Sequence, residues 1–378
     1  MGEILSFSRD MYTSQEESKT ILDNAVRLTN MAIQKYHAKD AVSNIGLYSA
    51  TPVNNVEYNE LNDTVKKAMI KYASKVANIG DMFDVNTTPG FKSATGQFSA
   101  FREALFAIET KIIDSVNSKS EVEQALLMAE LRNLADGDSE TFDIGTKSLF
   151  NVEDTGYSNN STRLQYQFMK PEFLTPRPKD AAIAIDLYQF NAIGFDFGKQ
   201  MAKLAISFRV AMYDSIIAAI FDTTPLVGTP FYKASFAKTT WQELANRVAG
   251  ANGSPVMAYG TNIALGKASD TVGDKWAFGV SEEFVKNGFV RDLYGVNAME
   301  LRQAVSSNDA NYTFKVPDDK ILLLTPATDK PVKVVMEGQT FVIADDGRTN
   351  AINLKTYKYR QAWATKIATQ SAYAIQAV

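Results

Sequence analysis

The side chains that most often carry catalysis or bind transition metals are nearly absent from this sequence. It has 378 residues with a single histidine, His37, and no cysteine. Zinc and iron sites need several such ligands, and activated nucleophiles need a base beside a serine or cysteine. His37 lies between Lys35 and Lys39 at the polar end of a helical pattern, which indicates a solvated side chain. No G-x-S-x-G motif occurs. We therefore expect no catalytic residue, no metal site and no cofactor.

Carboxylates are the remaining candidates for chemistry, and they form two short clusters. The first fits the start of a calcium-binding loop and comprises Asp136, Asp138, Glu140 and Asp143. Such a loop needs a glycine where this chain has Thr141 and a bidentate glutamate where it has Lys147, so we interpret the cluster as a solvated turn. The second cluster, Asp345 and Asp346 before Gly347, suits a turn equally well. A carboxylate pair of the glycosidase type stays open as an alternative.

Two segments have some features of a phosphate-binding site. Residues 260–267 (GTNIALGK) approach a P-loop, but five residues separate the glycines instead of four, and Ala268 replaces the Ser or Thr that holds magnesium. This excludes the P-loop. Lys67, Lys71 and Lys75 recur on one helical face, where the absence of interleaved aromatics favours a solvated surface.

The composition is that of an ordinary globular protein. Hydrophobic residues make up 45% and charged residues 22%, enough over this length for two or more cores. The net charge of −4 and the pI near 5.4 exclude a strong long-range attraction to nucleic acid or acidic membranes. Residues 1–10 (MGEILSFSRD) lack the pattern of a signal peptide, and no window approaches about 18 continuous apolar residues. We expect a protein that folds in the cytoplasm.

Amphipathic helices are predicted throughout the first third of the chain. Their apolar residues recur at three- and four-residue spacing over about residues 14–36, 57–79, 98–116 and 120–137. The first and fourth begin with S-x-x-E capping boxes. All four need a surface against which to pack.

The pattern then changes from helical to extended. Residues 137–162 are rich in Gly, Asn, Ser and Asp, which predicts an arm without a core of its own. Alternation within 163–168 and again within 183–189 predicts the two strands of a long β-hairpin. Its tip contains Pro171, Pro176 and Pro178, which we expect to prevent pairing with a third strand.

A long helix and a set of shorter elements complete the chain. Asp196 is the predicted cap of a helix that extends to residue 222 and is roughly 39 Å long. Helices opening at Thr240, Thr261 and Ser281 alternate with predicted strands at 255–259, 276–280, 320–325 and 332–343. The structure of residues 356–378 stays open. The result is an α+β unit after the long helix.

In this order of elements, residues 138–378 resemble the major capsid proteins of tailed bacteriophages, which have the Hong Kong ninety-seven type fold. The stretches PVMAY, TNIAL, FGVSEEFVKNGFVRDLYGVNAM and ILLLTP carry the resemblance. It implies an α+β fold with five parts. These are a helical N-terminal region (1–137), a polar arm and extended hairpin (138–195), a spine helix with the peripheral domain (196–238), an axial domain (239–345) and a C-terminal return to the peripheral domain (346–378).

The resemblance also implies a structural protein and not an enzyme. Its subunits would form the hexamers and pentamers of an icosahedral shell that encloses double-stranded DNA, in a virion assembled in the host bacterial cytoplasm. Implied partners are further copies of the chain, portal and scaffolding or accessory capsid proteins, and DNA bound without sequence specificity, with no membrane. We place assembly contacts at the hairpin tip, at Phe173, Leu174, Pro176 and Arg177. In such a shell, the face with Lys67, Lys71 and Lys75 is a candidate for a basic interior surface. The alternatives are an encapsulin-like compartment and, more remotely, a carboxylate-dependent hydrolase or sugar-binding protein.

Overall fold

The chain forms two compact units, each assembled from separate stretches of sequence, in a computed structural model. The structure describes residues 16–37, 54–76, 104–105, 107–115, 128–135, 137–144, 152, 170–186, 196–270, 280–301, 303, 313–326, 329–337, 341–345, 354–369 and 371–378. Unit 1 comprises residues 1–123, 177–213 and 336–363, and unit 2 comprises residues 124–176, 214–335 and 364–378. The five-part division of the sequence stays a prediction.

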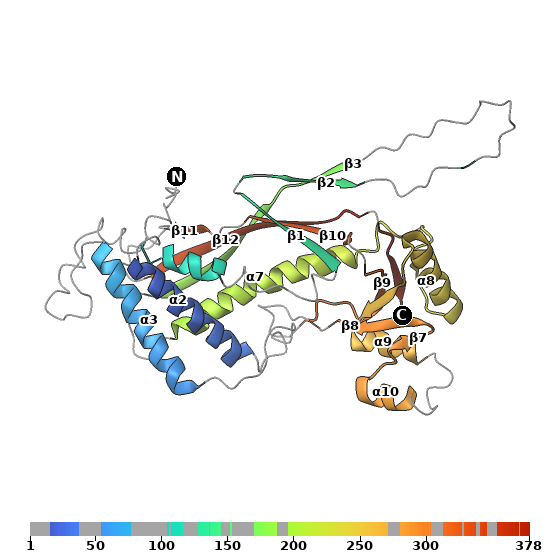
Figure 1. Cartoon of the computed structure of the whole chain (residues 1–378), viewed down its shortest axis with the longest axis horizontal. Helices are drawn as coiled ribbons and strands as arrows, with labels where there is room; N and C mark the ends of the chain where they lie inside the picture. The colour runs from blue at the N-terminus through green and yellow to red at the C-terminus, as the bar shows by residue number, and fades with distance from the viewer. Residues whose placement is uncertain are drawn as a thin grey trace. The chain divides into compact units, whose positions relative to one another are not determined.

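Unit 1 has a helical core. Helix α2 (Glu16–Ala32), which continues as a π-helical turn η1 (Ile33–His37), lies beside α3 (Asn55–Val76) (Figure 1). Their apolar faces pack with the helical residues 104–105 and 107–115 and with the first half of the long helix α7 (Phe197–Ile220). All of these helices were predicted. The predicted capping serine at position 14 and the predicted end of the second helix near residue 80 lie outside the described residues.

The junction of α3 and α7 depends on hydrogen bonds and on one close contact at a glycine, which the spacing of apolar residues in the sequence does not predict. The Asp196 carboxylate accepts a hydrogen bond from the Lys199 backbone N–H at 2.9 Å, which confirms the predicted cap. The Asn62 side chain of α3 accepts another from the Phe197 N–H at 3.0 Å. A Cβ on Gly198 would come within 2.9 Å of the Leu28 side chain, so only glycine allows this close approach.

A three-stranded antiparallel ladder completes unit 1. Strand β12 (Leu354–Ile367) pairs on one side with β4 (Arg177–Asp186) and on the other with β11 (Phe341–Asp345). Tyr359 and Trp363 of β12 pack against Leu204 and Phe208 of α7, with the Phe208 and Trp363 rings edge to face at 6.3 Å. The final segment, whose type the sequence left open, is therefore a strand to residue 367 and again in β13 (Ala374–Ala377).

Unit 2 contains the α+β assembly that was predicted after the long helix. Its six-stranded sheet has the order β5-β13-β9-β6-β8-β7. The strands are β5 (Tyr232–Lys233), β6 (Met257–Gly260), β7 (Asp292–Leu293), β8 (Val296–Glu300), β9 (Lys320–Leu324) and β13. Helices α8 (Lys238–Asn252), α9 (Asn262–Ser269) and α10 (Val280–Asn287) accompany it. Residues 276–279 of a predicted strand lie outside the described residues, whereas Val280 begins α10.

Capping residues in the sequence predicted the starts of most of these helices. Thr261 caps α9 by accepting a hydrogen bond from the Ala264 N–H at 3.2 Å, as predicted. Thr240 lies three residues inside α8 instead of at its cap, where its hydroxyl accepts from the Ala237 N–H at 3.0 Å. The core forms around Trp241, whose indole N–H donates to the Leu293 carbonyl at 3.0 Å.

The predictions for residues 120–144 differ from the structure after residue 128. Residues 120–127 of the predicted helix over 120–137 lie outside the described residues and Met128 is helical, but the helix does not continue, because Ala129–Leu134 form a strand, β1, which pairs with β10 (Val332–Glu337). The predicted polar arm contains a second strand, β2 (Glu140–Ile144). In both cases pairing with a strand distant in sequence outweighs the local helix or loop preference. Within the described residues, no helix is long and apolar enough to span a membrane.

Candidate assembly site at the base of a β-hairpin

A β-hairpin is present, but its strands are not those that were predicted. β2 pairs antiparallel with β3 (Lys170–Leu174), with Glu140 opposite Leu174 and Ile144 opposite Lys170. The predicted arms of the hairpin were 163–168 and 183–189. The first lies outside the described residues, and the described part of the second belongs to β4, whose partner is β12. The extended hairpin therefore starts about 20 residues earlier than expected.

The prolines consequently lie at the base of the hairpin and not at its tip. Pro171 is in β3 opposite Asp143, and Pro178 is in β4 opposite Ala362. The expectation that they prevent pairing with a third strand was wrong for Pro178, because β4 pairs with β12, a strand outside the predicted hairpin. Among the described residues β3 and β4 each pair on one side alone, and a missing N–H is tolerated on the other side. Pro176 is buried in the two-residue step between β3 and β4. Residues 145–169 connect β2 to β3 in the sequence, and of these the structure describes Val152.

The base of the hairpin packs on one face of the paired strands β1 and β10. Every second residue of each strand contributes its side chain to this face. Side chains two residues apart on a strand share a face. On β1 these are Glu130, Arg132 and Leu134, and on β10 they are Lys333 and Val335. Val335 is fully buried in a cluster with Phe142 of β2 and Leu174 of β3. The Arg132 guanidinium lies 4.3 Å from the centre of the Phe142 ring, a cation–π contact.

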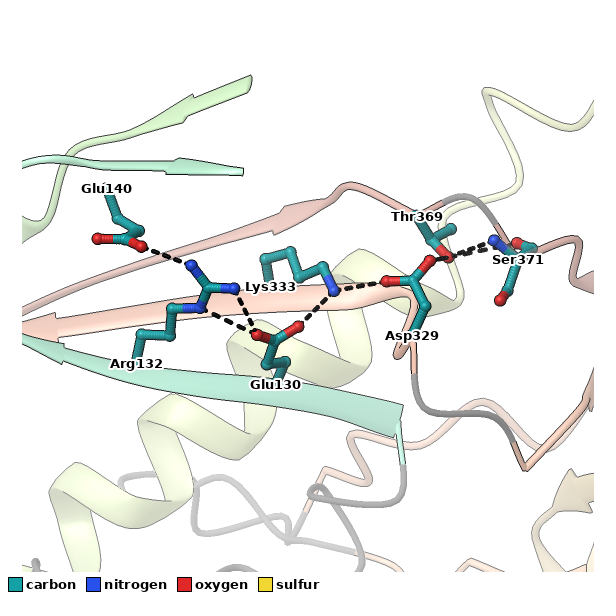
Figure 2. A network of polar contacts seen from close by, with 7 residues as sticks. All are labelled: Glu130, Arg132, Glu140, Asp329, Lys333, Thr369 and Ser371. Atoms are coloured by element: carbon teal, nitrogen blue, oxygen red, sulfur yellow. Dashed lines mark hydrogen bonds and ion pairs between the residues drawn. The ribbon is translucent and has the colours of Figure 1, made fainter. Parts of the chain in front are cut away.

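Ion pairs connect the β2 strand of the hairpin to this face. Arg132 contacts Glu140 of β2 at 2.5 Å and Glu130 of its own strand at 2.8 Å (Figure 2). Lys333 of β10 contacts Glu130 at 2.5 Å. Burial by itself raises the pKa of Glu130, but hydrogen bonds from Lys333 and Arg132 outweigh it and hold that pKa below its ordinary value. Glu130 is thus charged at neutral pH and joins β1 to β10.

The same network continues to the turn that precedes β13. The Lys333 side chain is only 6% exposed, and it also contacts Asp329 at 2.7 Å. Asp329 accepts a hydrogen bond from the Thr369 hydroxyl at 2.9 Å, and Thr369 in turn accepts from the Ser371 N–H at 2.8 Å (Figure 2). The buried ammonium group therefore has two carboxylate partners, which offset the cost of removing it from water.

A separate ion pair holds the other strand of the hairpin. Lys366 of β12 contacts Glu172 of β3. Each strand of the hairpin thus has its own charged connection, Glu140 to Arg132 and Glu172 to Lys366, with Phe142 and Leu174 packed between them. An isolated two-stranded hairpin is only marginally stable, so these contacts are what fix its base.

The four residues predicted to form the tip have different environments. Phe173 is 66% exposed, whereas the adjacent Leu174 is 3% exposed and belongs to the cluster at the base. Arg177 is exposed at the start of β4, opposite Trp363. None of them lies at the tip. Sequence reasoning missed Glu130, Arg132, Lys333 and Lys366, because their pairing depends on strands that are far apart in the chain.

The other candidate residues do not gather into a catalytic site in the described part of the chain. Lys67, Lys71 and Lys75 are exposed on α3, and Lys75 contacts Glu17 of α2 at 2.8 Å. His37 ends η1. Glu140 and Asp143 belong to β2 and not to a solvated turn, and Asp345 ends β11. No group of three or more possible metal ligands occurs among the described residues.

Glu109 is a buried acid in unit 1 that was not among the predicted site residues. Glu109, within the helical residues 107–115, is 3% exposed and accepts a hydrogen bond from the Tyr359 hydroxyl at 2.6 Å. Burial raises the pKa of Glu109 to about 7, although the bond from Tyr359 acts in the opposite direction. The signal was available, because Glu109 precedes Ile112 and Ile113 by three and four residues and so shares their buried face.

No family model and no curated protein matches the sequence. Comparison with solved structures finds similar chains at low identity. An asymmetric unit of the bacteriophage PhiM1 mature capsid is 12% identical, with 67% of this chain and 86% of that chain covered and a TM-score of 0.41. A Mycobacterium phage Ogopogo structure is 10% identical, with 67% and 91% covered and a TM-score of 0.45. A virus-like particle from Pyrococcus furiosus is 12% identical, with 70% and 95% covered and a TM-score of 0.38.

Proposed function

We propose that this chain is a structural shell subunit, the major capsid protein of a tailed phage, and not an enzyme. One observation carries the proposal: a hairpin that is anchored at its base by a buried cluster and by an ion pair on each strand. An arm fixed in this way transmits force to the rest of its subunit when its far end contacts another copy. The hairpin is followed by the long helix α7 and an α+β unit, which is the order that the sequence resemblance implies.

The exposed apolar residues of the hairpin support its use as a contact between copies. Phe173 and Val152 are 66% and 93% exposed, whereas Phe142, Leu174 and Val335 in the cluster at the base are buried. Among the described residues, β3 pairs with β2 alone, which leaves its other edge without a strand partner. Exposed apolar side chains and free strand edges favour association with another chain, and in a shell that chain is a neighbouring subunit.

The finer parts of the proposal follow from a shell role. Hexamers and pentamers of the chain would enclose double-stranded DNA, bound without sequence specificity, with portal and scaffolding or accessory proteins as partners. Assembly would take place in the host bacterial cytoplasm, and the mature location would be the virion. An encapsulin-like compartment would use the same contacts around protein cargo, so the enclosed molecule distinguishes the two.

Electron microscopy of the purified protein, with sizing chromatography of the same sample over a range of concentrations, tests the proposal. We expect closed shells, capsomers or tubes, and nuclease-resistant DNA inside particles isolated from infected cells. Protein cargo without DNA would assign a compartment instead. A protein that stays monomeric over the whole concentration range overturns the shell role.

A single substitution tests the placement of the contact. Phe173→Asp should abolish particles and leave the urea unfolding midpoint unchanged, because the side chain is exposed in the subunit and an unpaired charge is costly in an interface. Val227→Asp, at a side chain that is 60% exposed in a turn, is the matched control and should assemble. Normal particles from Phe173→Asp refute the contact at this position. Leu174 is unsuitable for this test because it is buried in the subunit.

A further inference from the structure

The exposed face of α3 has an unusual distribution of charge. Its first half carries Glu60 and Asp63, and its second half carries Lys67 and Lys71, all exposed and all within a narrow stripe along the helix axis. In the described part of the chain, none of these four side chains has an ion-pair partner. Two intramolecular ion pairs lie at the flank of α3 that faces α2, where Arg27 contacts Glu57 and Lys75 contacts Glu17.

We infer that this stripe binds the same stripe of a second copy, with the two α3 helices antiparallel across a twofold axis. In that arrangement Glu60 faces Lys71 of the other copy and Asp63 faces its Lys67, and symmetry repeats both pairs. A stripe that is acidic in one half and basic in the other is complementary to itself only when antiparallel. The two ion pairs between α2 and α3 of one copy already follow this rule. Glu17 at the acidic start of α2 contacts Lys75 at the basic end of α3, and Arg27 of α2 contacts Glu57 at the acidic start of α3.

A groove beside the stripe provides apolar surface for the same contact. It has a volume of about 440 Å³ between α2 and α3, with Ile21, Val65, Ala68 and Tyr72 among its lining residues and Lys71 at its rim. The aliphatic stems of lysine side chains from the second copy can cover such a surface while their ammonium groups meet carboxylates. The inference rests on the proposed shell function, because a contact of this size needs the other subunit contacts to hold the two copies together.

The geometry makes a definite prediction for disulfide trapping, since the chain has no cysteine of its own. Thr64 lies where the charge changes sign, so the two Thr64 residues come within roughly 5 Å of each other along the axis. Two copies of Asn55, exposed at the first turn of α3, are then roughly 30 Å apart. A disulfide needs Cα atoms about 4.4–6.8 Å apart. Oxidation of assembled Thr64→Cys particles should give a disulfide dimer, and Asn55→Cys particles should give none.

Charge reversal then tests the cause. Lys67→Glu with Lys71→Glu places like charges opposite one another and should abolish the Thr64→Cys dimer. Adding Glu60→Lys and Asp63→Lys restores self-complementarity with the original net charge, and the dimer should return.

Particles that assemble but give no Thr64→Cys dimer overturn this contact and leave the shell role standing. If Lys67→Glu with Lys71→Glu also lowers packaged DNA, the stripe binds phosphate instead. If no particles form, the shell role fails, and this contact, which depends on it, fails with it.

Discussion

Replacement of Glu109 by glutamine should remove a large part of the pH dependence of subunit stability. The folded-state pKa of Glu109 is raised from 4.5 to about 7 because the carboxyl group is buried. Between these two values the folded chain holds a proton that the unfolded chain has lost. The free energy of unfolding therefore falls as pH rises through this window, and the loss is complete above pH 7.

The size of the effect follows from the shift. A difference of about 2.5 pKa units at 1.36 kcal/mol each corresponds to roughly 3 kcal/mol. Glu109→Gln has no proton to lose, and its amide oxygen can still accept the hydrogen bond from Tyr359. We expect the two proteins to have similar stability at pH 4.5 and the variant to be about 3 kcal/mol more stable at pH 7.5.

Urea unfolding at half-unit pH intervals, followed by circular dichroism, measures this difference. Hydrogen exchange of β12 peptides at each pH locates it in unit 1. Tyr359→Phe is a second check, because it removes the hydrogen bond that lowers the pKa of Glu109 and should extend the loss of stability to higher pH. If the wild-type protein and Glu109→Gln lose stability in parallel between pH 4.5 and 7.5, burial does not control this carboxyl group and the reasoning is wrong.

Further predictions concern single contacts in unit 2, each measured by urea denaturation. Leu174→Ala should cost about 2–4 kcal/mol by leaving a cavity in the cluster at the hairpin base, whereas Phe173→Ala should change stability by less than about 0.5 kcal/mol. Lys333→Ala should cost roughly 1–3 kcal/mol, because Glu130 loses its main partner; an unchanged midpoint would show that water replaces the ammonium group. Gly288→Ala should cost about 1–3 kcal/mol, because φ is +78° and the new Cβ would lie 2.6 Å from the Asn262 side chain; Gly250→Ala, with open space, is its control.

Sequence reasoning succeeded where a signal and the structure that it specifies lie within a few residues of each other. Asp196 caps α7 through the Lys199 N–H, and Thr261 caps α9 through the Ala264 N–H, three residues away in each case. The long helix was likewise predicted within two residues of its observed bounds, Phe197–Ile220. Hydrogen bonds of this range are properties of the local chain, so tertiary packing did not alter them.

Sequence reasoning failed where pairing with a strand distant in the sequence determines the secondary structure. The stretch AELRNL in β1 is rich in good helix formers, yet it is a strand because β10, some 200 residues later, offers a ladder. The polar strand β2 has only Phe142 and Ile144 as strong apolar residues, and its pairing with β3 crosses 25 intervening residues. A hairpin was predicted, but from alternation in segments other than β2 and β3, so its strands, its register and its anchoring charges were not predictable.

The position of two adjacent residues on β3 lets one strand stabilise the subunit and, in the proposed shell, contact a neighbour. Neighbouring side chains on a strand face opposite ways, so Leu174 is buried at the hairpin base while Phe173 is exposed. A register slip of one residue would exchange them, exposing the anchor and burying the contact side chain. The ion pairs of Glu140 and Glu172 oppose such a slip, because each would lose its partner on the underlying strands. The charged network at the base thus keeps the apolar contact residue on the outer face, where a second copy can reach it.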